Sequence, residues 1–263
     1  MLNHIGRSHL LFMTFDTLRY DVAQELFERG RLPTLARHLP AHGWQRRHTP
    51  ATFTYAAHHA FFAGFLPTPE SPGTHPRLFA SQFGGSETTT ASTFTFPEAT
   101  LPQALSARGY HTICVGGTGF FNPDNALGRV LPGLFDEAHW SPAMSVVDRD
   151  SPAHQVDCAV QAIERQPGLT FCFINFAAIH QPNWFYANEA THADRRDTLA
   201  SHAGALVEVD RQLPRLLDYL RRRGSLFAIA CSDHGTAYGE DGYWGHRLAH
   251  RVVLEVPYAE FEW

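Results

Sequence analysis

Runs of consecutive apolar residues alternate with amphipathic stretches along most of this chain. A short apolar run bounded by polar residues is typical of a strand that is buried on both faces of a parallel sheet. Apolar residues spaced three or four apart, with a Gly at the end, are typical of a helix. Because the two patterns alternate, they predict an α/β fold, a three-layer sandwich whose central sheet is mostly parallel.

The predicted strands are His9–Phe15, Gly43–His48, His111–Gly116, Leu169–Phe176, Leu226–Cys231 and Arg251–Val256. The predicted helices are Tyr20–Arg29, Pro33–Leu39, Thr54–Gly64, Pro97–Arg108, Ala153–Arg165 and Thr198–Arg223. Two stretches, Pro67–Phe96 and Gly117–Asp150, show no periodicity and contain many turn-forming residues. A stretch as long as the first, inside a compact domain, is more often a functional loop than a linker.

Polar residues directly follow two of the predicted strands. Asp16-Thr17-Leu18-Arg19 follows the first strand, and Ser232-Asp233-His234-Gly235 follows the strand that ends at Cys231. Ligands of open α/β sheets collect at the edge where parallel strands end. Two carboxylates and an imidazole at that edge therefore predict a site for a divalent cation. Thr54, at the start of a predicted helix, supplies a hydroxyl that can act as a nucleophile beside the cation.

Composition limits the classes of function. The 263 residues are 44% hydrophobic and 18% charged, which predicts one large domain with a sizeable core. A net charge of −5 argues against nucleic acid as the main partner. The sequence contains no lysine, so an anion must be recognised by Arg, His, backbone N–H groups or metal. No apolar run approaches the roughly 20 residues of a membrane span, so no membrane partner is expected. The oligomeric state stays open.

Cysteine usage bears on the cellular compartment. The four cysteines are scattered without CxxC spacing, at Cys114, Cys158, Cys172 and Cys231. Three of them lie in predicted strands, where thiols are usually inert. The N-terminal apolar run from Leu10 to Phe15 is too short for a signal peptide. These features predict a reducing compartment, the cytoplasm.

Several motifs together resemble the alkaline phosphatase superfamily, and most closely its sulfatase-like branch of small bacterial hydrolases. Residues 16–21, Asp-Thr-Leu-Arg-Tyr-Asp, resemble the Asp-Thr-Leu-Arg-Ala-Asp opening of many sulfatase-like enzymes. Thr54, with His58 four residues on and Gly64 ten on, resembles the nucleophile helix of sulfatases and of nucleotide pyrophosphatase/phosphodiesterases. Residues 232–235 resemble the second metal motif of the superfamily, and residues 239–245 the Gly-Glu-His-Gly-Leu-Trp-Gly segment downstream of it.

The resemblance implies one alkaline phosphatase/sulfatase-like catalytic domain over residues 1–263, without the C-terminal subdomain of ordinary sulfatases. It implies that Asp16, Asp233 and His234 hold a divalent metal ion, zinc or manganese rather than calcium. The oxygen of Thr54 would bind the same ion, which stabilises an alkoxide that is otherwise inaccessible near neutral pH. One ion is expected, because the Asp that helps to hold a second ion in the phosphodiesterase branch is missing.

Departures from the sulfatase pattern favour phosphorus over sulfur as the attacked atom. Sulfatases convert a Cys or Ser to formylglycine, and Thr54 cannot form that aldehyde because its β-carbon carries a methyl group. Gly116-Gly117-Thr118-Gly119 stands where sulfatases have Gly-Lys-x-His, and His246 stands where they have a Lys after Trp-Gly. The usual sulfate-binding cations are therefore absent.

Other residues complete the predicted site. His180, in a His-Gln-Pro segment similar to the His-x-Pro element of sulfatases, and His246 are candidates to contact the substrate or protonate the leaving group. His58, Asn175 and His250 are candidates for supporting roles. Thr54 has a plain alternative as a helix N-cap, and Thr52 is a competing nucleophile with the wrong spacing. Asp210 is expected to be a surface residue in a salt bridge, whereas Arg19 is left open between a structural and an anion-binding role.

These inferences together predict a metal-dependent hydrolase of phosphate esters, with a phosphodiester or small organophosphate as its small-molecule substrate. A phospho-group transferase shares the first half-reaction and is a second candidate. The sequence is also compatible with a sulfatase acting on sulfate esters and with a non-catalytic metal-binding relative.

Overall fold

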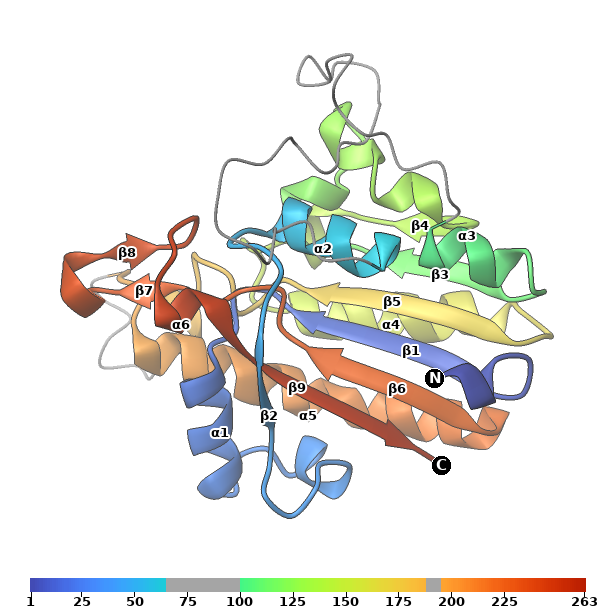
Figure 1. The fold of residues 1–263 in the computed structure, drawn as a ribbon, viewed down its shortest axis with the longest axis horizontal. Helices are drawn as coiled ribbons and strands as arrows, with labels where there is room; N and C mark the ends of the chain where they lie inside the picture. The colour runs from blue at the N-terminus through green and yellow to red at the C-terminus, as the bar shows by residue number, and fades with distance from the viewer. Residues whose placement is uncertain (65–99, 188–194) are drawn as a thin grey trace, which may run out of the picture.

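The computed structural model describes residues 1–64, 100–187 and 195–263. Its main sheet has seven strands in the order β2-β9-β6-β1-β5-β3-β4 (Figure 1). These strands are β1 (His9–Phe15), β2 (Gln45–His48), β3 (His111–Val115), β4 (Glu137–His139), β5 (Thr170–Phe176), β6 (Leu226–Cys231) and β9 (Glu255–Glu262). β1 pairs in parallel with β5 and β6, and β3 pairs in parallel with β4 and β5. The pairings of β9 with β2 and β6 are antiparallel. The other four described pairings in this sheet are parallel, so the predicted mostly parallel sheet is confirmed.

Helices cover both faces of this sheet. α1 (Tyr20–Glu28), α4 (Ser151–Glu164) and α5 (Leu199–Arg223) pack on one face, and α2 (Thr54–Ala63) and α3 (Leu101–Ser106) pack on the other (Figure 1). Alternate residues of β1 divide between two cores, since Leu11 joins the first and Phe12 the second. The three-layer α/β sandwich is therefore confirmed.

Local sequence explains where the longest helix lies. In α5 the buried residues recur at helical spacing, among them Leu206, Leu213 and Leu220. Its N-cap, Thr198, accepts a hydrogen bond from the backbone N–H of Ser201 at 3.1 Å. The result is an amphipathic helix with one apolar face against the sheet.

α2 differs, because it is apolar on nearly all sides. Its buried residues are Thr54, Ala57, His58, His59, Ala60 and Phe62. A helix of this kind is stable only when it is enclosed by the rest of the protein. Its enclosure holds its first turn over the ends of the central strands.

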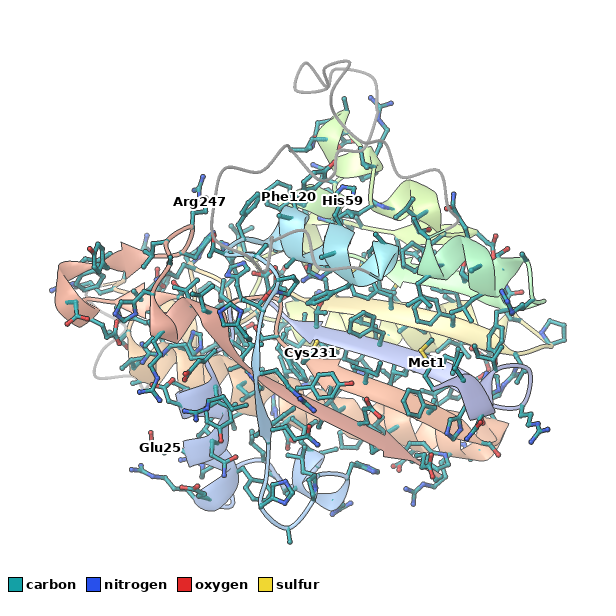
Figure 2. The ribbon with its side chains drawn as sticks, in the orientation of Figure 1. Met1, Glu25, His59, Phe120, Cys231 and Arg247 are labelled. Atoms are coloured by element: carbon teal, nitrogen blue, oxygen red, sulfur yellow. The ribbon has the colours of Figure 1, made fainter. Side chains whose placement is uncertain are left out.

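The described free cysteines are Cys114, Cys158, Cys172 and Cys231. Cys231, at the end of β6, belongs to the core on the α2 side of the sheet (Figure 2). Burial raises the pKa of the Cys231 thiol far above its ordinary value, so this thiol is inert. No helix within the described ranges has the length and hydrophobicity that a membrane crossing requires.

Some predicted elements are wrong or shorter than expected. The stretch Arg251–Val256 is not a strand: it begins with a one-turn helix, α6 (Arg251–Leu254), and the strand β9 starts only at Glu255. The stretch Pro33–Leu39 contains only a short 3-10 turn, Leu35–Arg37. The small hairpin of β7 (Ala237–Tyr238) and β8 (Trp244–Gly245) was not expected from the sequence.

Other boundaries move by a few residues. The helix predicted over Pro97–Arg108 is described as Leu101–Ser106, and residues 97–99 lie outside the described ranges. The short strand β4 falls inside the stretch predicted to be irregular. The loop predicted over Pro67–Phe96 also lies outside the described residues.

Candidate active site

Two neighbouring parallel strands bring their following acidic residues together. Thr14 of β1 lies opposite Cys231 of β6 in the ladder. Asp16 and Asp233 each come two residues after this pair, so both carboxylates emerge at the same edge of the sheet. The Ser232 hydroxyl joins the strand ends by donating to the carbonyl of Phe15 at 2.7 Å. Chain topology alone therefore places two carboxylates side by side.

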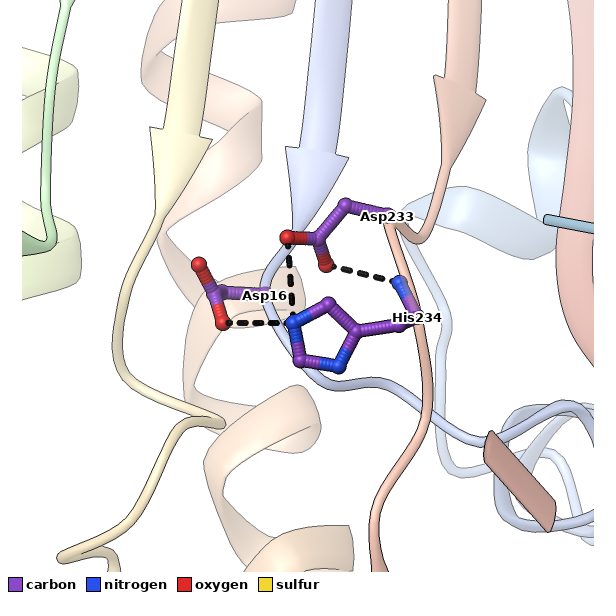
Figure 3. Close-up of side chains that lie close together, drawn as sticks. All are labelled: Asp16, Asp233 and His234. Carbon is purple, nitrogen blue, oxygen red and sulfur yellow. Dashed lines mark hydrogen bonds and ion pairs between the residues drawn. The ribbon is translucent and has the colours of Figure 1, made fainter. Parts of the chain in front are cut away.

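His234 completes a cluster with the two acids (Figure 3). One ligand atom from each of Asp16, Asp233 and His234 lies within 4.8 Å of the others, and all three side chains are buried. Asp16 Oδ1 and Asp233 Oδ2 have no hydrogen-bond partner among the described residues. Orphaned buried carboxylate oxygens are costly, and a cation between them would satisfy both. The donor set thus fits a divalent ion.

The hydrogen bond made by the far side of the His234 ring fixes its tautomer. Nδ1 of His234 lies 2.9 Å from the carbonyl oxygen of Gly235, which can only accept. Nδ1 therefore carries the proton, and Nε2 presents its lone pair to the cluster. Nε2 lies 3.5 Å from Asp233 Oδ2 and 4.0 Å from Asp16 Oδ1. Burial lowers the pKa of His234, which keeps the ring neutral and able to bind a metal.

Thr54 brings a hydroxyl to the same point. It is the first residue of α2, and Phe53 is the N-cap. Thr54 Oγ1 donates to Asp16 Oδ2 at 3.3 Å and lies 3.3 Å from His234 Nε2. The plain N-cap interpretation of Thr54 is therefore wrong, because its hydroxyl faces the cluster rather than the backbone of its own helix. The N-terminus of α2 adds a partial positive charge.

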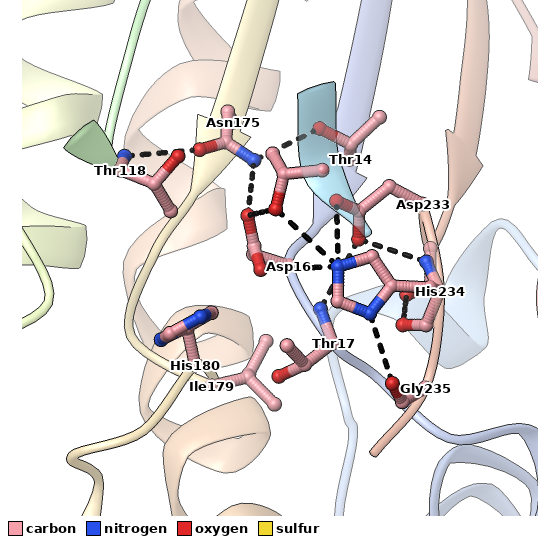
Figure 4. A network of polar contacts seen from close by, with 12 residues as sticks. Thr14, Asp16, Thr17, Thr118, Asn175, Ile179, His180, Asp233, His234 and Gly235 are labelled. Atoms are coloured by element: carbon pink, nitrogen blue, oxygen red, sulfur yellow. Dashed lines mark hydrogen bonds and ion pairs between the residues drawn. The ribbon is translucent and has the colours of Figure 1, made fainter. Parts of the chain in front are cut away.

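Asn175, at the end of β5, orients Asp16 from the other side (Figure 4). Its carbonyl oxygen accepts from the backbone N–H of Thr118 at 3.2 Å, so its NH₂ group faces the acid. That NH₂ group donates to Asp16 Oδ2 at 3.1 Å and to Thr14 Oγ1 at 3.4 Å. Asn175 is thus a supporting residue that fixes one carboxylate oxygen and leaves the other for a ligand.

His58, one turn further along α2, supports the position of Thr54. Its Nδ1 donates to the Thr54 carbonyl at 2.7 Å, and its Nε2 lies 3.0 Å from Thr14 Oγ1. Burial lowers the pKa of His58 to about 3, so the ring stays neutral. His58 does not touch the Thr54 hydroxyl and acts on the position of the helix turn.

His180 and His246 border the cluster, although they come from separate loops. The ring of His246 lies 4.7 Å from that of His234 and 5.4 Å from that of His180, measured between centroids. Nδ1 of His180 donates to the Gln181 carbonyl at 2.5 Å, which leaves Nε2 available. Burial, together with the neighbouring His234, lowers the pKa of His246 to about 3.

Other candidates lie away from the cluster. His250 is the N-cap of α6, where Nδ1 accepts from the Val252 N–H at 3.2 Å, and its Nε2 pairs with Asp241 at 3.1 Å. The carbonyl of Thr52 accepts from the backbone N–H of Arg247, so Thr52 is held as part of a loop. Among the described residues, neither the His250 side chain nor that of Thr52 shares a hydrogen bond with the group around Thr54.

Arg19 is held in ion pairs with carboxylates of the protein and has a structural role. Arg19 is 3% exposed, and its guanidinium donates to both oxygens of Asp21, with Nε 2.9 Å from Oδ1, while Nη1 contacts Glu240. Arg19 thus ties the loop after β1 to the β7–β8 hairpin, the segment that leads to His246. An anion would have to displace these carboxylates to reach Arg19.

The expectation for Asp210 is wrong. It is 1% exposed and accepts hydrogen bonds from the backbone N–H groups of Thr34 and Leu35, at 3.0 and 2.7 Å. It is therefore a buried cap for the 3-10 turn at Leu35–Arg37 and not a surface ion pair. Sequence periodicity placed Asp210 on α5 correctly but could not reveal a partner segment that lies far away in the chain.

Sequence reasoning also missed two hydroxyl residues beside the site. Thr17 and Thr118 are 1% and 5% exposed, and neither hydroxyl has a hydrogen-bond partner among the described residues. Each follows directly after a motif residue at the carboxyl end of a strand, which is the only signal that the sequence offers for them.

Comparisons with known proteins agree with this architecture. A family model described as Sulfatase matches residues 9–258. None of the curated proteins matches the sequence. The periplasmic domain of phosphoethanolamine transferase EptC from Campylobacter jejuni is 11% identical, with a TM-score of 0.62, and the alignment covers 97% of this chain and 79% of that one. The corresponding domain of EcEptC from Escherichia coli, in complex with Zn, is 13% identical, with a TM-score of 0.61 and 97% and 72% coverage.

A further neighbour is the lipoteichoic acid synthase LtaP from Listeria monocytogenes. It is 13% identical, with a TM-score of 0.62, and the alignment covers 97% of this chain but less than two thirds, 65%, of LtaP. At these identities the likeness to solved structures is evidence for the fold alone.

Proposed function

This chain belongs to the Sulfatase family, and on that premise we propose that it is a metal-dependent enzyme that cleaves phosphate esters with Thr54 as nucleophile. One observation carries the proposal: the buried Thr54 hydroxyl lies 3.3 Å from both Asp16 Oδ2 and His234 Nε2, beside two carboxylate oxygens that lack partners. A hydroxyl aimed at a prospective cation site is the arrangement that nucleophilic catalysis requires.

Phosphorus is favoured as the attacked atom because of the identity of the nucleophile. The Cβ methyl of Thr54 prevents formation of the aldehyde through which sulfatases act. The absence of lysine, together with a single expected ion, leaves little positive charge to balance a dianionic monoester. A phosphodiester or a small organophosphate therefore suits the site better.

The proposed metal site consists of Asp16, Asp233, His234 and Thr54. A mixed set of carboxylate and imidazole ligands suits zinc or manganese better than calcium, which prefers oxygen ligands alone. When bound, the ion would act as a Lewis acid that lowers the pKa of the Thr54 hydroxyl and neutralises negative charge on the ester.

The residues of the chain supply the remaining steps. Asn175 and His58 hold Asp16 and the first turn of α2, so that the Thr54 oxygen faces the ester. Thr54 Oγ1 passes its proton to Asp16 Oδ2, its hydrogen-bond acceptor, and attacks phosphorus in line with the leaving oxygen to form a phosphothreonine. We assign protonation of the leaving oxygen to His180 in its doubly protonated form, because the Nδ1 proton is held by the Gln181 carbonyl and the proton that is donated must come from Nε2. The low pKa of His246, about 3, suits a neutral hydrogen-bonding role. Water then gives a proton to Nε2 of His180 and attacks the phosphothreonine, while the released Thr54 oxygen recovers its proton from Asp16.

A transferase is the second candidate. Three neighbouring structures, one from Campylobacter jejuni and two from Neisseria meningitidis, are named as phosphoethanolamine transferases. In a transferase, an alcohol would replace water in the second half-reaction, and the residues around Thr54 would be the same.

The test combines turnover with trapping of the covalent intermediate. Purified protein loaded with Zn²⁺ or Mn²⁺ is assayed with chromogenic phosphodiesters, phosphomonoesters and sulfate esters, and Thr54 is examined for phosphate by mass spectrometry. We expect diester turnover and phosphate on Thr54. Thr54→Ala should lower kcat by at least about 10³-fold, whereas Thr54→Ser should retain part of the activity.

Each competing function has its own outcome in this test. Faster turnover of sulfate esters than of phosphate esters would identify a sulfatase. Modification of Thr54 that is discharged only by added alcohols would identify a transferase. A folded, metal-binding protein without turnover and without phosphate on Thr54 would refute the proposal and leave a non-catalytic relative.

The cytoplasmic location stays a prediction. It is supported by free cysteines, which fit a reducing compartment. Two neighbours are named as periplasmic domains, so fractionation of cells that produce the whole protein is the measurement that decides.

A further inference from the structure

Thr17, the residue directly after Asp16, has a backbone conformation that is unfavourable for its type. Its φ is +62°, in the left-handed region that glycine enters freely and that β-branched residues avoid. This turn directs the Thr17 N–H to Asp233 Oδ1, at 3.1 Å. A glycine would donate the same hydrogen bond without the strain, so the backbone alone does not explain a threonine here.

The Thr17 side chain carries a second cost. It is 1% exposed, and its hydroxyl has no hydrogen-bond partner among the described residues. An unpaired buried hydroxyl is unfavourable relative to a methyl group of similar shape. Strain and an unsatisfied polar group at one position are typical of a site that is arranged for a ligand rather than for stability.

The Thr17 hydroxyl points to the side of the cluster where His180 lies. Figure 4 shows the Thr17 side chain beside Asp16 and His234, with its hydroxyl directed toward Ile179 and His180. We assigned His180 to the leaving oxygen, so a hydroxyl directed to the side of the cluster where His180 lies faces the reacting ester. Thr17 has a proton to donate, and ester oxygens accept hydrogen bonds.

We propose that the Thr17 hydroxyl is a substrate-binding group, which donates a hydrogen bond to an oxygen of the tetrahedral oxyanion that is transferred. The inference rests on the proposed function, because it takes the reacting group to be a phosphate or sulfate ester bound beside Thr54. The hydrogen bond strengthens as negative charge develops on that oxygen, so it contributes more to the transition state than to ground-state binding.

The experiment compares three variants with the wild type. Thr17→Val removes the hydroxyl and keeps the branched shape, and Thr17→Ser keeps the hydroxyl. Thr236→Val is the matched control, because Thr236 is also fully buried with an orphaned hydroxyl, but on a backbone without positive φ. Measured quantities are kcat and KM of the Zn²⁺-loaded protein, the affinity for inorganic phosphate by calorimetry, and the melting temperature of the ion-free protein.

Thr17→Val is expected to lower kcat/KM by about 10- to 100-fold, mainly through kcat, and to weaken phosphate binding about tenfold. Its melting temperature should equal or exceed that of the wild type, since an unpaired hydroxyl is lost. Thr17→Ser should stay within about threefold of wild-type kcat/KM. Thr236→Val should leave both catalysis and phosphate affinity unchanged.

Two results would overturn the inference. One is a Thr17→Val protein with wild-type turnover and phosphate affinity. The other is a Thr17→Val protein that melts several degrees lower and whose defects Thr17→Ser shares, since the hydroxyl would then have a structural role. If the wild type cleaves no ester, the proposed function fails, but the phosphate affinities of the variants still decide the role of Thr17.

Discussion

In the ion-free protein, the buried carboxylates of Asp16 and Asp233 lower the stability of the fold when they are charged. Burial and the neighbouring charge of Asp233 together raise the pKa of Asp16 to about 6, and burial raises the pKa of Asp233 to about 7. Each shift means that the folded protein disfavours the charged carboxylate. A divalent cation reverses this preference, so the same residues that destabilise the ion-free site would hold the ion tightly.

Asn175 provides a test at the scale of a single contact. Asn175→Leu keeps the approximate shape of the side chain but removes the hydrogen bond that fixes Asp16 Oδ2. Loss of such a supporting contact typically weakens metal binding by about 10- to 100-fold, because the ligand is no longer oriented. Competition with a chromogenic zinc chelator measures the change. Unchanged zinc affinity in a folded Asn175→Leu protein would mean that Asn175 does not orient the ligand.

The structure brings predicted residues together where their chemistry and their position in the chain coincide. Asp16, Asp233 and His234 follow strands directly, and Thr54 starts a helix, so sequence order alone brought them to one edge. The partner of a side chain that contacts a distant part of the chain could not be predicted in this way. His250 caps its own helix, and nothing in the sequence distinguishes a cap from a ligand.

At the scale of elements, the buried strands and long helices were predictable and the edges were not. Strands β1, β5 and β6 are continuous apolar runs because both of their faces are covered. β9 alternates between buried and exposed residues over most of its length and follows a one-turn helix, so its pattern is weak. The stretch Pro33–Leu39 forms only a short turn, which is stabilised by contacts with α5 rather than by its own periodicity.

Asp210 tests that long-range contact between elements. Asp210→Ala removes the acceptor for two buried backbone N–H groups and should destabilise the fold by about 3 kcal/mol. For a protein of this size the melting temperature should fall by roughly 5–10 °C. Activity per folded molecule should stay unchanged, because Asp210 lies apart from the site. Asp218→Ala, an exposed position on the same helix, is the control and should change stability by less than about 0.5 kcal/mol.

A melting temperature of Asp210→Ala equal to that of the Asp218→Ala control would contradict the capping role. Asp210→Asn gives an intermediate test, because its amide oxygen can still accept from one of the two N–H groups. Its loss of stability should lie between those of the alanine variants. Thermal denaturation followed by circular dichroism is sufficient for all three proteins.

At the scale of the whole molecule, the site depends on contacts between distant parts of the chain. The loop after β1, the first turn of α2 and the loop after β6 meet only when the sheet is complete. Arg19 joins the first of these loops to the β7–β8 hairpin through Glu240. Hydrophobic periodicity predicts that parallel strands end at a common edge, but it does not give their order, so the adjacency of β1 and β6 could not be predicted from the pattern alone.

Metal binding should therefore stabilise the whole fold, and by an amount that depends on pH. The pKa values of Asp16 and Asp233 are raised in the folded protein, to about 6 and about 7, from an ordinary value near 4. Their favourable contribution to ion-free stability is complete below about pH 4 and is lost as the pH rises through 6 and 7. An ion needs both carboxylates charged, so at pH 5.5 it must displace protons that are already absent at pH 8.

Zn²⁺ at about 100 times its dissociation constant at pH 8 should stabilise the protein by about 2.7 kcal/mol. The corresponding rise in melting temperature is roughly 5–10 °C, and it should be much smaller at pH 5.5 with the same zinc concentration. The neutral rings of His58 and His202, whose pKa values burial lowers to about 3, give the stability of the fold the opposite pH dependence. Their contribution to the free energy of unfolding is complete above about pH 6.5 and declines toward pH 3. It cancels when zinc-loaded and ion-free melting temperatures are compared at one pH.

The Asp16→Asn variant is the control for the site of zinc binding. It should raise the ion-free melting temperature at pH 8, because one buried charge is removed, and should abolish most of the response to zinc. A zinc-induced shift that is equal at both pH values, or that survives in Asp16→Asn, would mean that zinc binds elsewhere on the protein.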